Sequence, residues 1–273
     1  MTLARTARRR AAPRQAEPQG PRSRAPSWPF GVAKQRSCKP GGSQVWLFDL
    51  DNTLHNASHA AFAGIDAGMT SYMERELEIS RAEADALRHR YWLRYGATLL
   101  GLVRHHGIDT AHFLHHTHLL PGLEDALHGH PHDFDALRRL RGRRFILTNA
   151  PRAYALRVLG ALGIAHLFDG VLAIEDMRMF GDLRPKPDAR MFRRVAARLR
   201  VPPSRCVLVE DTLAHQKSAR AVGMTTVWMQ RWARLAAKHI TTAPKVGVYL
   251  HRKPVYVCAR ISSLQQLRKK TLP

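Results

Sequence analysis

Cysteine is scarce in this sequence, with three residues among 273, at positions 38, 206 and 258. They are widely spaced and odd in number, which excludes the paired framework of a small disulfide-rich secreted protein. We therefore expect a reducing compartment and a cytoplasmic location. Cys206 opens an apolar run and is expected to be an ordinary core residue.

Long apolar runs are also absent. No stretch of about 18 apolar residues occurs, so we expect no transmembrane helix and no membrane partner. Residues 1–43 contain no apolar segment of signal-peptide length. They hold six prolines and little apolar periodicity, and such a segment buries too little surface to offset the entropy of ordering. We expect them to be a disordered basic tail, with a transit peptide or a nucleic-acid-binding arm as alternatives.

Acidic residues are few, 21 against 44 Lys and Arg, and the formal net charge is +23. Such a charge usually indicates a nucleic-acid or membrane-surface partner. Its distribution argues otherwise. Residues 1–43 hold ten basic and one acidic residue, and residues 233–273 hold nine basic and none acidic. The remaining 25 basic and 20 acidic residues leave the central region at +5. We therefore expect no nucleic-acid partner for this region.

The apolar patterns predict an α/β fold. Several short runs read as buried strands, at 45–48, 144–148, 171–174, 206–209 and 225–229. Helical patterns separate the later runs, at 151–162, 187–200 and 214–222. Strands that alternate with helices of about 10 to 15 residues are typical of a parallel sheet with right-handed crossovers. A last strand at 256–257 and a helix at 261–267 are expected within the basic C-terminal segment, 233–273.

The region 59–131 has helical periodicity throughout. Helices are expected at 59–78, 81–95, 98–106 and 110–119. Ser80 and Glu83 have the spacing of a capping box, which begins the second of them. We therefore predict a parallel α/β core, formed by 44–58 and 132–273, with an all-helical block inserted at 59–131.

Polar residues stand where the predicted strands end. They are Asp49 and Asp51 after the first strand, Thr148 and Asn149 at the second, and Glu210 and Asp211 at the fourth, with Lys186 opening the helix before it. The carboxyl ends of parallel strands share one edge of a sheet, where ligands bind. Carboxylates, a lysine and a hydroxyl gathered there outline a phosphate site.

Charge assigns the roles. Oxygen ligands from Asp49 and Asp211 suit Mg²⁺, which would let the Asp49 carboxylate attack an anionic phosphoryl group and form an aspartyl-phosphate. Lys186 adds a positive charge beside the nucleophile. Thr148 and the backbone amides near Asn149 donate hydrogen bonds to the transferring oxygens. Asp51 protonates the leaving oxygen and later deprotonates the attacking water.

In sequence order, the segments Asp49-Leu50-Asp51-Asn52-Thr53, Thr148-Asn149, Lys186-Pro187 and Glu210-Asp211 resemble the four motifs of the haloacid dehalogenase-like (HAD) hydrolase superfamily. The resemblance implies a Rossmann-like core with a cap between the first two motifs. It also implies Mg²⁺ held by Asp49, by the main-chain carbonyl of Asp51 and by Asp211, with Glu210 nearby.

A narrower resemblance lies in Thr148-Asn149-Ala150-Pro151, in the segment 95–99 (Tyr-Gly-Ala-Thr-Leu) and in Glu210-Asp211-Thr212-Leu213-Ala214. These segments are similar to the pyrimidine 5′-nucleotidase family, which implies a small phosphomonoester substrate such as UMP or CMP. Another small-molecule phosphatase, acting on phosphoglycolate or a sugar phosphate, is the nearest alternative. A nucleic-acid-binding protein that acts through its basic tails is the alternative of a different class.

Within the predicted cap, Tyr95 lies at a helix break that is expected to face the cleft, and it is the candidate for substrate contact. The sixteen histidines are interpreted as exposed positions of a biased composition, because the His-rich part of the cap offers no cysteine and no zinc-site spacing. The sequence gives no indication of the oligomeric state.

Overall fold

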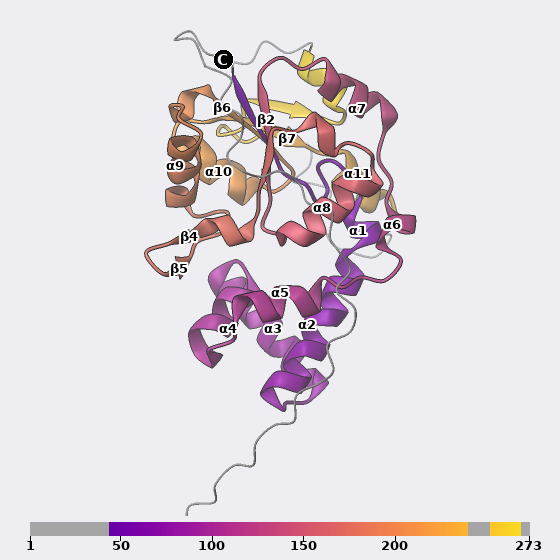
Figure 1. Ribbon diagram of the computed structural model, residues 1–273, viewed down its shortest axis with the longest axis vertical. Coiled ribbons are helices and arrows are strands. Elements are labelled where there is room, and N and C mark those ends of the chain that lie inside the picture. The colour runs from indigo at the N-terminus through magenta and orange to yellow at the C-terminus, as the bar shows by residue number, and fades with distance from the viewer. Residues whose placement is uncertain (1–43, 240–251, 269–273) are drawn as a thin grey trace, which may run out of the picture. The chain divides into compact units, whose positions relative to one another are not determined.

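The computed structural model describes residues 44–239 and 252–268, and the predicted basic tail, 1–43, lies outside them. A six-stranded sheet has the order β3-β2-β1-β6-β7-β8, and neighbouring strands in it are parallel (Figure 1). Its strands are β1 (Val45–Phe48), β2 (Arg143–Leu147), β3 (Gly170–Leu172), β6 (Cys206–Glu210), β7 (Thr225–Met229) and β8 (Ala259–Ile261). The predicted α/β, Rossmann-like fold is confirmed.

Helices make up much of the rest of the described residues. They are α1 (Ala57–Ala60), α2 (Phe62–Leu77), α3 (Arg81–Tyr95), α4 (Thr98–His106), α5 (Thr110–Thr117), α6 (Leu123–Ala126), α7 (Pro131–Arg138), α8 (Arg152–Ala161), α9 (Ala189–Arg198), α10 (Leu213–Ala221) and α11 (Arg231–His239). Four 3-10 turns accompany them, at Ala165–Leu167, Ile174–Met177, Pro203–Arg205 and Leu264–Arg268. Across the described residues, none of these helices is both long and apolar enough to span a bilayer.

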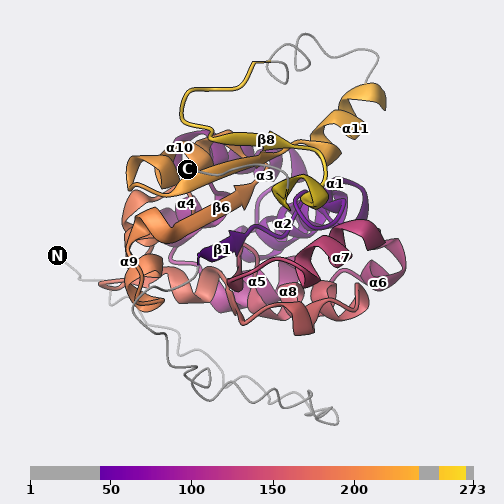
Figure 2. The ribbon, with the colours of Figure 1, turned by 90° about the horizontal axis from the view of Figure 1, so that it is seen from above.

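Both faces of the central strands are buried. Trp46 and Phe48 of β1 join a cluster that includes side chains of α7 and α8, which lie on one side of the strands in Figure 2. Val45 and Leu47 join a second cluster with side chains of α9 and α10. A strand covered on both faces needs no polar side. This explains why residues 45–48 form an unbroken apolar run rather than an alternating one.

The inserted helices α2 to α5 have an apolar cluster of their own, which includes Tyr72, Leu87 and Phe113. Ser80 accepts from the Glu83 amide and Glu83 accepts from the Ser80 amide, so the predicted capping box is present. The single helix predicted at 59–78 is wrong, because Ala61 leaves the helical conformation and separates α1 from α2.

The limits of the cap stay a prediction. Ala61 and Leu123 lie inside the predicted cap range, yet both belong to the first core cluster. Conversely, Ile174 and Leu183 from the segment after β3 pack in the cap cluster. Leu183 is part of an antiparallel hairpin, β4 (Arg178–Met179) and β5 (Asp182–Leu183), which the sequence did not predict. Arg178 donates a hydrogen bond to Thr110 Oγ1 of α5 at 2.9 Å, so this hairpin contacts the cap.

The C-terminal elements differ from the prediction. The last strand is β8 at Ala259–Ile261, whereas residues 256–257 lie before it in a turn and loop. The expected helix at 261–267 is a 3-10 turn, Leu264–Arg268. Buried Asp133 of α7 fixes this turn, because it accepts from Ser263 Oγ at 2.7 Å and from the Leu264 amide at 2.8 Å, and it pairs with Arg231. A long-range carboxylate contact of this kind leaves no local pattern in the sequence.

Gly142, just before β2, lies close to the backbone of Gln44, just before β1, and this close approach can be tested. Its φ is +108°, and an added Cβ would lie 2.2 Å from the backbone oxygen of Gln44. We expect Gly142→Ala to lower the free energy of unfolding by about 2 kcal/mol or more, because both the conformation and the contact oppose a side chain.

Urea denaturation monitored by circular dichroism measures this change. Gly160→Ala in α8 is the matched control, because an added Cβ there meets nothing within 4 Å. It should be neutral or stabilise by up to about 1 kcal/mol. Equal stabilities for the two variants would contradict the close approach at Gly142.

Candidate active site

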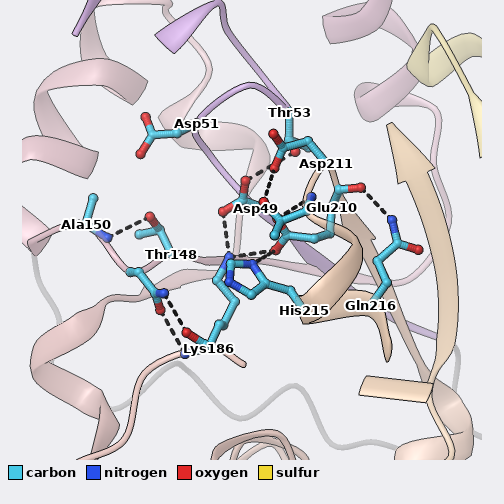
Figure 3. Close-up of polar contacts among 12 residues, drawn as sticks. Asp49, Asp51, Thr53, Thr148, Ala150, Lys186, Glu210, Asp211, His215 and Gln216 are labelled. Atoms are coloured by element: carbon cyan, nitrogen blue, oxygen red, sulfur yellow. Dashed lines mark hydrogen bonds and ion pairs between the residues drawn. The ribbon is translucent and has the colours of Figure 1, made fainter. Parts of the chain in front are cut away.

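The polar cluster lies where the order of the strands reverses. The chain adds β2 and β3 on one side of β1 and then crosses over to add β6 and β7 on the other side. Ligands in open α/β sheets bind at such a switch point. Phe48, the last residue of β1, aligns with Ile146 and Val209. Asp49, Thr148 and Glu210 therefore reach the same edge, as Figure 3 shows.

Lys186 lies at the centre of this cluster. It is 2% exposed, and its Nζ lies 2.6 Å from Asp49 Oδ1 and 2.7 Å from Glu210 Oε2. The side chain of Asn149 holds its backbone, donating to the Lys186 carbonyl and accepting from the Lys186 amide, both at 2.9 Å. The Asn149 side chain thus binds the loop that carries Lys186. The backbone amide of Asn149 is therefore the group of this residue that is available to a phosphate.

Glu210 is surrounded by hydrogen-bond donors. Besides Lys186, His215 Nδ1 lies 3.1 Å from its Oε2, and the Thr212 amide donates to its Oε1 at 3.2 Å. Burial alone would raise the pKa of Glu210, but Lys186 and His215 hold it well below its usual value. Burial would likewise lower the pKa of Lys186, but the carboxylates of Asp49 and Glu210 raise it. Lys186 and Glu210 are therefore both charged at neutral pH.

The pKa values of Asp49 and Asp211 are raised above their usual range. Burial and the Glu210 carboxylate raise the pKa of Asp49 to about 7, although Lys186 acts against this shift. Burial, Glu210 and Asp49 raise the pKa of Asp211 well above its usual value. One lysine is insufficient to neutralise three crowded carboxylates, so the cluster favours a further positive charge.

The donor set fits a divalent metal ion. Asp49, Glu210 and Asp211 each offer an oxygen, and these oxygens lie within 4.8 Å of one another. Carboxylate oxygens are the ligands that Mg²⁺ prefers. Glu210 contacts Lys186 and His215 through Oε2 and accepts from the Thr212 amide through Oε1, whereas Asp49 contacts Lys186 through Oδ1 only. Asp49 and Asp211 are therefore the better placed to hold the ion. The side chain of Asp51 is outside this group, so any ligand from that residue would come from its main chain.

The Asp51 carboxylate points away from Asp49, Glu210 and Asp211 in Figure 3. Its Oδ1 accepts a hydrogen bond from Tyr154 Oη at 2.8 Å and lies 3.0 Å from His55 Nε2. Sequence analysis missed both partners. Tyr154 comes from α8 and His55 from the loop after β1, and neither position has a motif or a periodicity that marks it.

Thr148 and Thr53 also belong to the site, whereas the predicted Tyr95 lies apart from it. Thr148 is buried and accepts a hydrogen bond from the Ala150 amide at 3.0 Å, and its hydroxyl hydrogen has no acceptor among the described residues. Thr53, which sequence analysis did not assign, donates to Asp49 Oδ2 at 3.2 Å. Tyr95 lies in the cap, where its hydroxyl pairs with His105 Nε2 at 2.5 Å, so the structure does not bring its hydroxyl to Lys186 or Asp49.

The solved structures that resemble this chain include two HAD enzymes. The HAD phosphatase from Thermococcus onnurineus has a TM-score of 0.51 at 24% identity, covering 83% of this chain and 96% of that one. The HAD-hydrolase YfnB from Bacillus subtilis, solved bound to magnesium, has a TM-score of 0.50 at 18% identity, covering 83% and 97%. At such identities the likeness shows a shared fold.

The curated proteins that resemble it in sequence include two phosphate-related proteins. Phosphate metabolism protein 8 from Saccharomyces cerevisiae is 27% identical over 195 residues, which are 66% of this chain and 60% of that protein. Fructose-1-phosphate phosphatase YqaB from Escherichia coli is 35% identical over 95 residues, 34% of this chain and 48% of that protein. The chain thus spans about half to three-fifths of the length of these relatives.

A family model described as haloacid dehalogenase-like hydrolase matches residues 44–223. The matched region contains all the polar strand-end residues described above. Its parallel sheet and inserted helices agree with the fold of the HAD structures. The chain belongs to the haloacid dehalogenase-like hydrolase family.

Proposed function

We propose that the protein is a magnesium-dependent phosphatase that hydrolyses pyrimidine nucleoside 5′-monophosphates through an aspartyl-phosphate. The observation that supports this most directly is the contact of Lys186 Nζ with both Asp49 and Glu210, at 2.6 and 2.7 Å, beside a third carboxylate at Asp211. This arrangement combines a nucleophile with a fixed positive charge and a metal-binding pair. Phosphoryl transfer needs these groups in one place.

In the first step, a carboxylate oxygen of Asp49 attacks phosphorus, and the bond from phosphorus to the leaving oxygen breaks. Asp51 gives its proton to that oxygen, and the alcohol leaves. In the second step, water attacks phosphorus and gives a proton to Asp51. The acyl-phosphate bond breaks, which releases inorganic phosphate and restores the Asp49 carboxylate.

The remaining groups of the site hold the phosphate. Lys186 lies against Asp49 and offsets the negative charge of the phosphoryl oxygens. The Thr148 hydroxyl and the backbone amide of Asn149 donate to those oxygens. Asp49, Asp211 and the main chain of Asp51 would hold Mg²⁺, which when bound neutralises charge between nucleophile and phosphate.

The substrate is assigned from the resemblance of residues 95–99, 148–151 and 210–214 to pyrimidine 5′-nucleotidases. Tyr95 remains the proposed contact with the base. Gly96 beside it supports this placement, because a Cβ there would lie 4.0 Å from Pro187 Cδ, next to Lys186. Fructose 1-phosphate is the second candidate, because one relative is named as a phosphatase for it.

We predict that the protein releases inorganic phosphate from UMP and CMP faster than from fructose 1-phosphate or phosphoglycolate, and only when Mg²⁺ is present. A phosphate-release assay across these four compounds, with Mg²⁺ or with EDTA, measures this. Preference for a sugar phosphate would reject the nucleotidase assignment and keep the phosphatase. Release that is unaffected by EDTA would reject the metal.

Asp49→Asn is expected to reduce kcat/KM at least about a thousandfold, because it replaces the nucleophilic carboxylate with a neutral amide of the same shape. Asp125→Asn is the matched control, since Asp125 is exposed in α6. It should retain the activity of the unmodified chain. Substantial turnover by Asp49→Asn would contradict the covalent mechanism.

The pKa of Asp49 predicts a pH dependence of stability in the metal-free protein. Folding raises this pKa from 3.8 to about 7. Between these two pH values, Asp49 keeps its proton in the folded state but has lost it in the unfolded chain. The stability that Asp49 contributes is therefore full below about pH 4 and is lost as the pH rises to 7.

Urea unfolding in EDTA at pH 5, 6 and 7 tests this. The stability of the unmodified protein relative to Asp49→Asn should fall by roughly 1 kcal/mol per pH unit. The comparison cancels the titration of the sixteen histidines. Mg²⁺ should stabilise the unmodified protein more at pH 7 than at pH 5, because it competes with the proton. Parallel curves for the two proteins would contradict the shift.

A further inference from the structure

The contacts of Asp51 point to two residues whose roles the proposed chemistry does not include. Both polar contacts of its carboxylate are made by Oδ1, to Tyr154 Oη and His55 Nε2, at 2.8 and 3.0 Å. Its Oδ2 has no hydrogen bond within the described ranges. One oxygen is thus fixed by the protein, and the other is left to meet a substrate or water.

Both partners are buried. Tyr154 is 1% exposed and packs in the first core cluster, and His55 is fully buried. The other ring nitrogen of His55, Nδ1, has no hydrogen-bond partner in the part of the chain that the structure describes. Among the described residues, the contact with Asp51 is therefore the only polar contact of this buried ring. A buried imidazole usually has a hydrogen-bond partner on both nitrogens.

The Tyr154 ring also contacts the segment between α5 and α6. His118, just after α5, packs edge-on against it, with 5.5 Å between the ring centroids. Arg157, one turn further along α8, donates to the Leu120 carbonyl at 3.0 Å and pairs with Glu124. The position of the tyrosine hydroxyl is thus determined by both α8 and the segment between α5 and α6.

We propose that Tyr154 and His55 are positioning residues for Asp51: by binding Oδ1 they hold the carboxyl group in the orientation from which Oδ2 exchanges a proton with the leaving oxygen and with water. This inference rests on the proposed phosphatase function. General acid catalysis depends on such placement, because a proton is transferred only across hydrogen-bond distance. Neither residue touches the substrate in this scheme.

The test uses the dependence of the reaction on the leaving group. A nucleotide or sugar phosphate releases a poor leaving group that needs a proton from Asp51, whereas p-nitrophenyl phosphate releases an acidic phenol that needs little help. We expect Tyr154→Phe to lower kcat/KM for the best natural phosphomonoester by about 10- to 100-fold. For p-nitrophenyl phosphate the expected loss is less than about threefold, so the ratio of the two constants falls at least threefold.

Other variants separate positioning from general damage. His55→Leu removes the second hydrogen bond and should lower the same ratio, so the test does not depend on Tyr154→Phe folding. In an Asp51→Asn background, Tyr154→Phe should cause no further loss. Tyr72→Phe is the matched control, because it also removes a buried tyrosine hydroxyl, one that contacts His112 in the cap at 2.8 Å. It should leave the ratio unchanged.

The outcomes are distinct. Equal losses on both substrates, or values like those of the unmodified chain, in both Tyr154→Phe and His55→Leu would overturn the positioning role. An additional loss in the Asp51→Asn background would also overturn it. An unmodified protein that releases phosphate from no phosphomonoester, p-nitrophenyl phosphate included, would reject the proposed function and this inference with it.

Discussion

The ammonium of Lys186, buried between two carboxylates, is the interaction on which the site depends. An unpaired buried charge costs several kcal/mol, so this lysine is stable in its position only while Asp49 and Glu210 lie beside it. Those two residues come from different strands, and the lysine comes from a loop that Asn149 holds through its backbone. Each of these elements therefore has to be in register for the charges to balance.

The same loop connects the site to the cap. Between β3 and α9 the chain carries Ile174 and Leu183, which pack in the cap cluster, and between them Arg178, which contacts Thr110. Lys186 follows in the same segment. Apolar contact with the cap and ionic contact with the nucleophile are thus made within one short segment. The backbone that precedes the lysine is therefore in direct contact with the cap helices.

The sequence predicted the sheet and the acidic cluster well, because both have local signatures. Apolar runs marked the strands, and Asp49, Thr148, Lys186 and Asp211 followed strand ends or opened a helix in a recognisable order. Contacts between distant positions were not predictable in this way. Tyr154 lies 103 residues from Asp51 and reaches it through folding alone, and Asp133 binds the distant turn at Leu264 in the same way. His55 is close to Asp51 in sequence, but no motif marks it.

The position of β1 has a consequence for the order of folding. Its neighbours β2 and β6 both follow the inserted cap in sequence, and β6 is separated from it by most of the described chain. The loops that these pairings close are long, and closing long loops slows folding. During synthesis, Asp49 emerges before Lys186, Glu210 and Asp211, so the four residues can be brought together only after β6 has left the ribosome. No shorter nascent chain contains the assembled site.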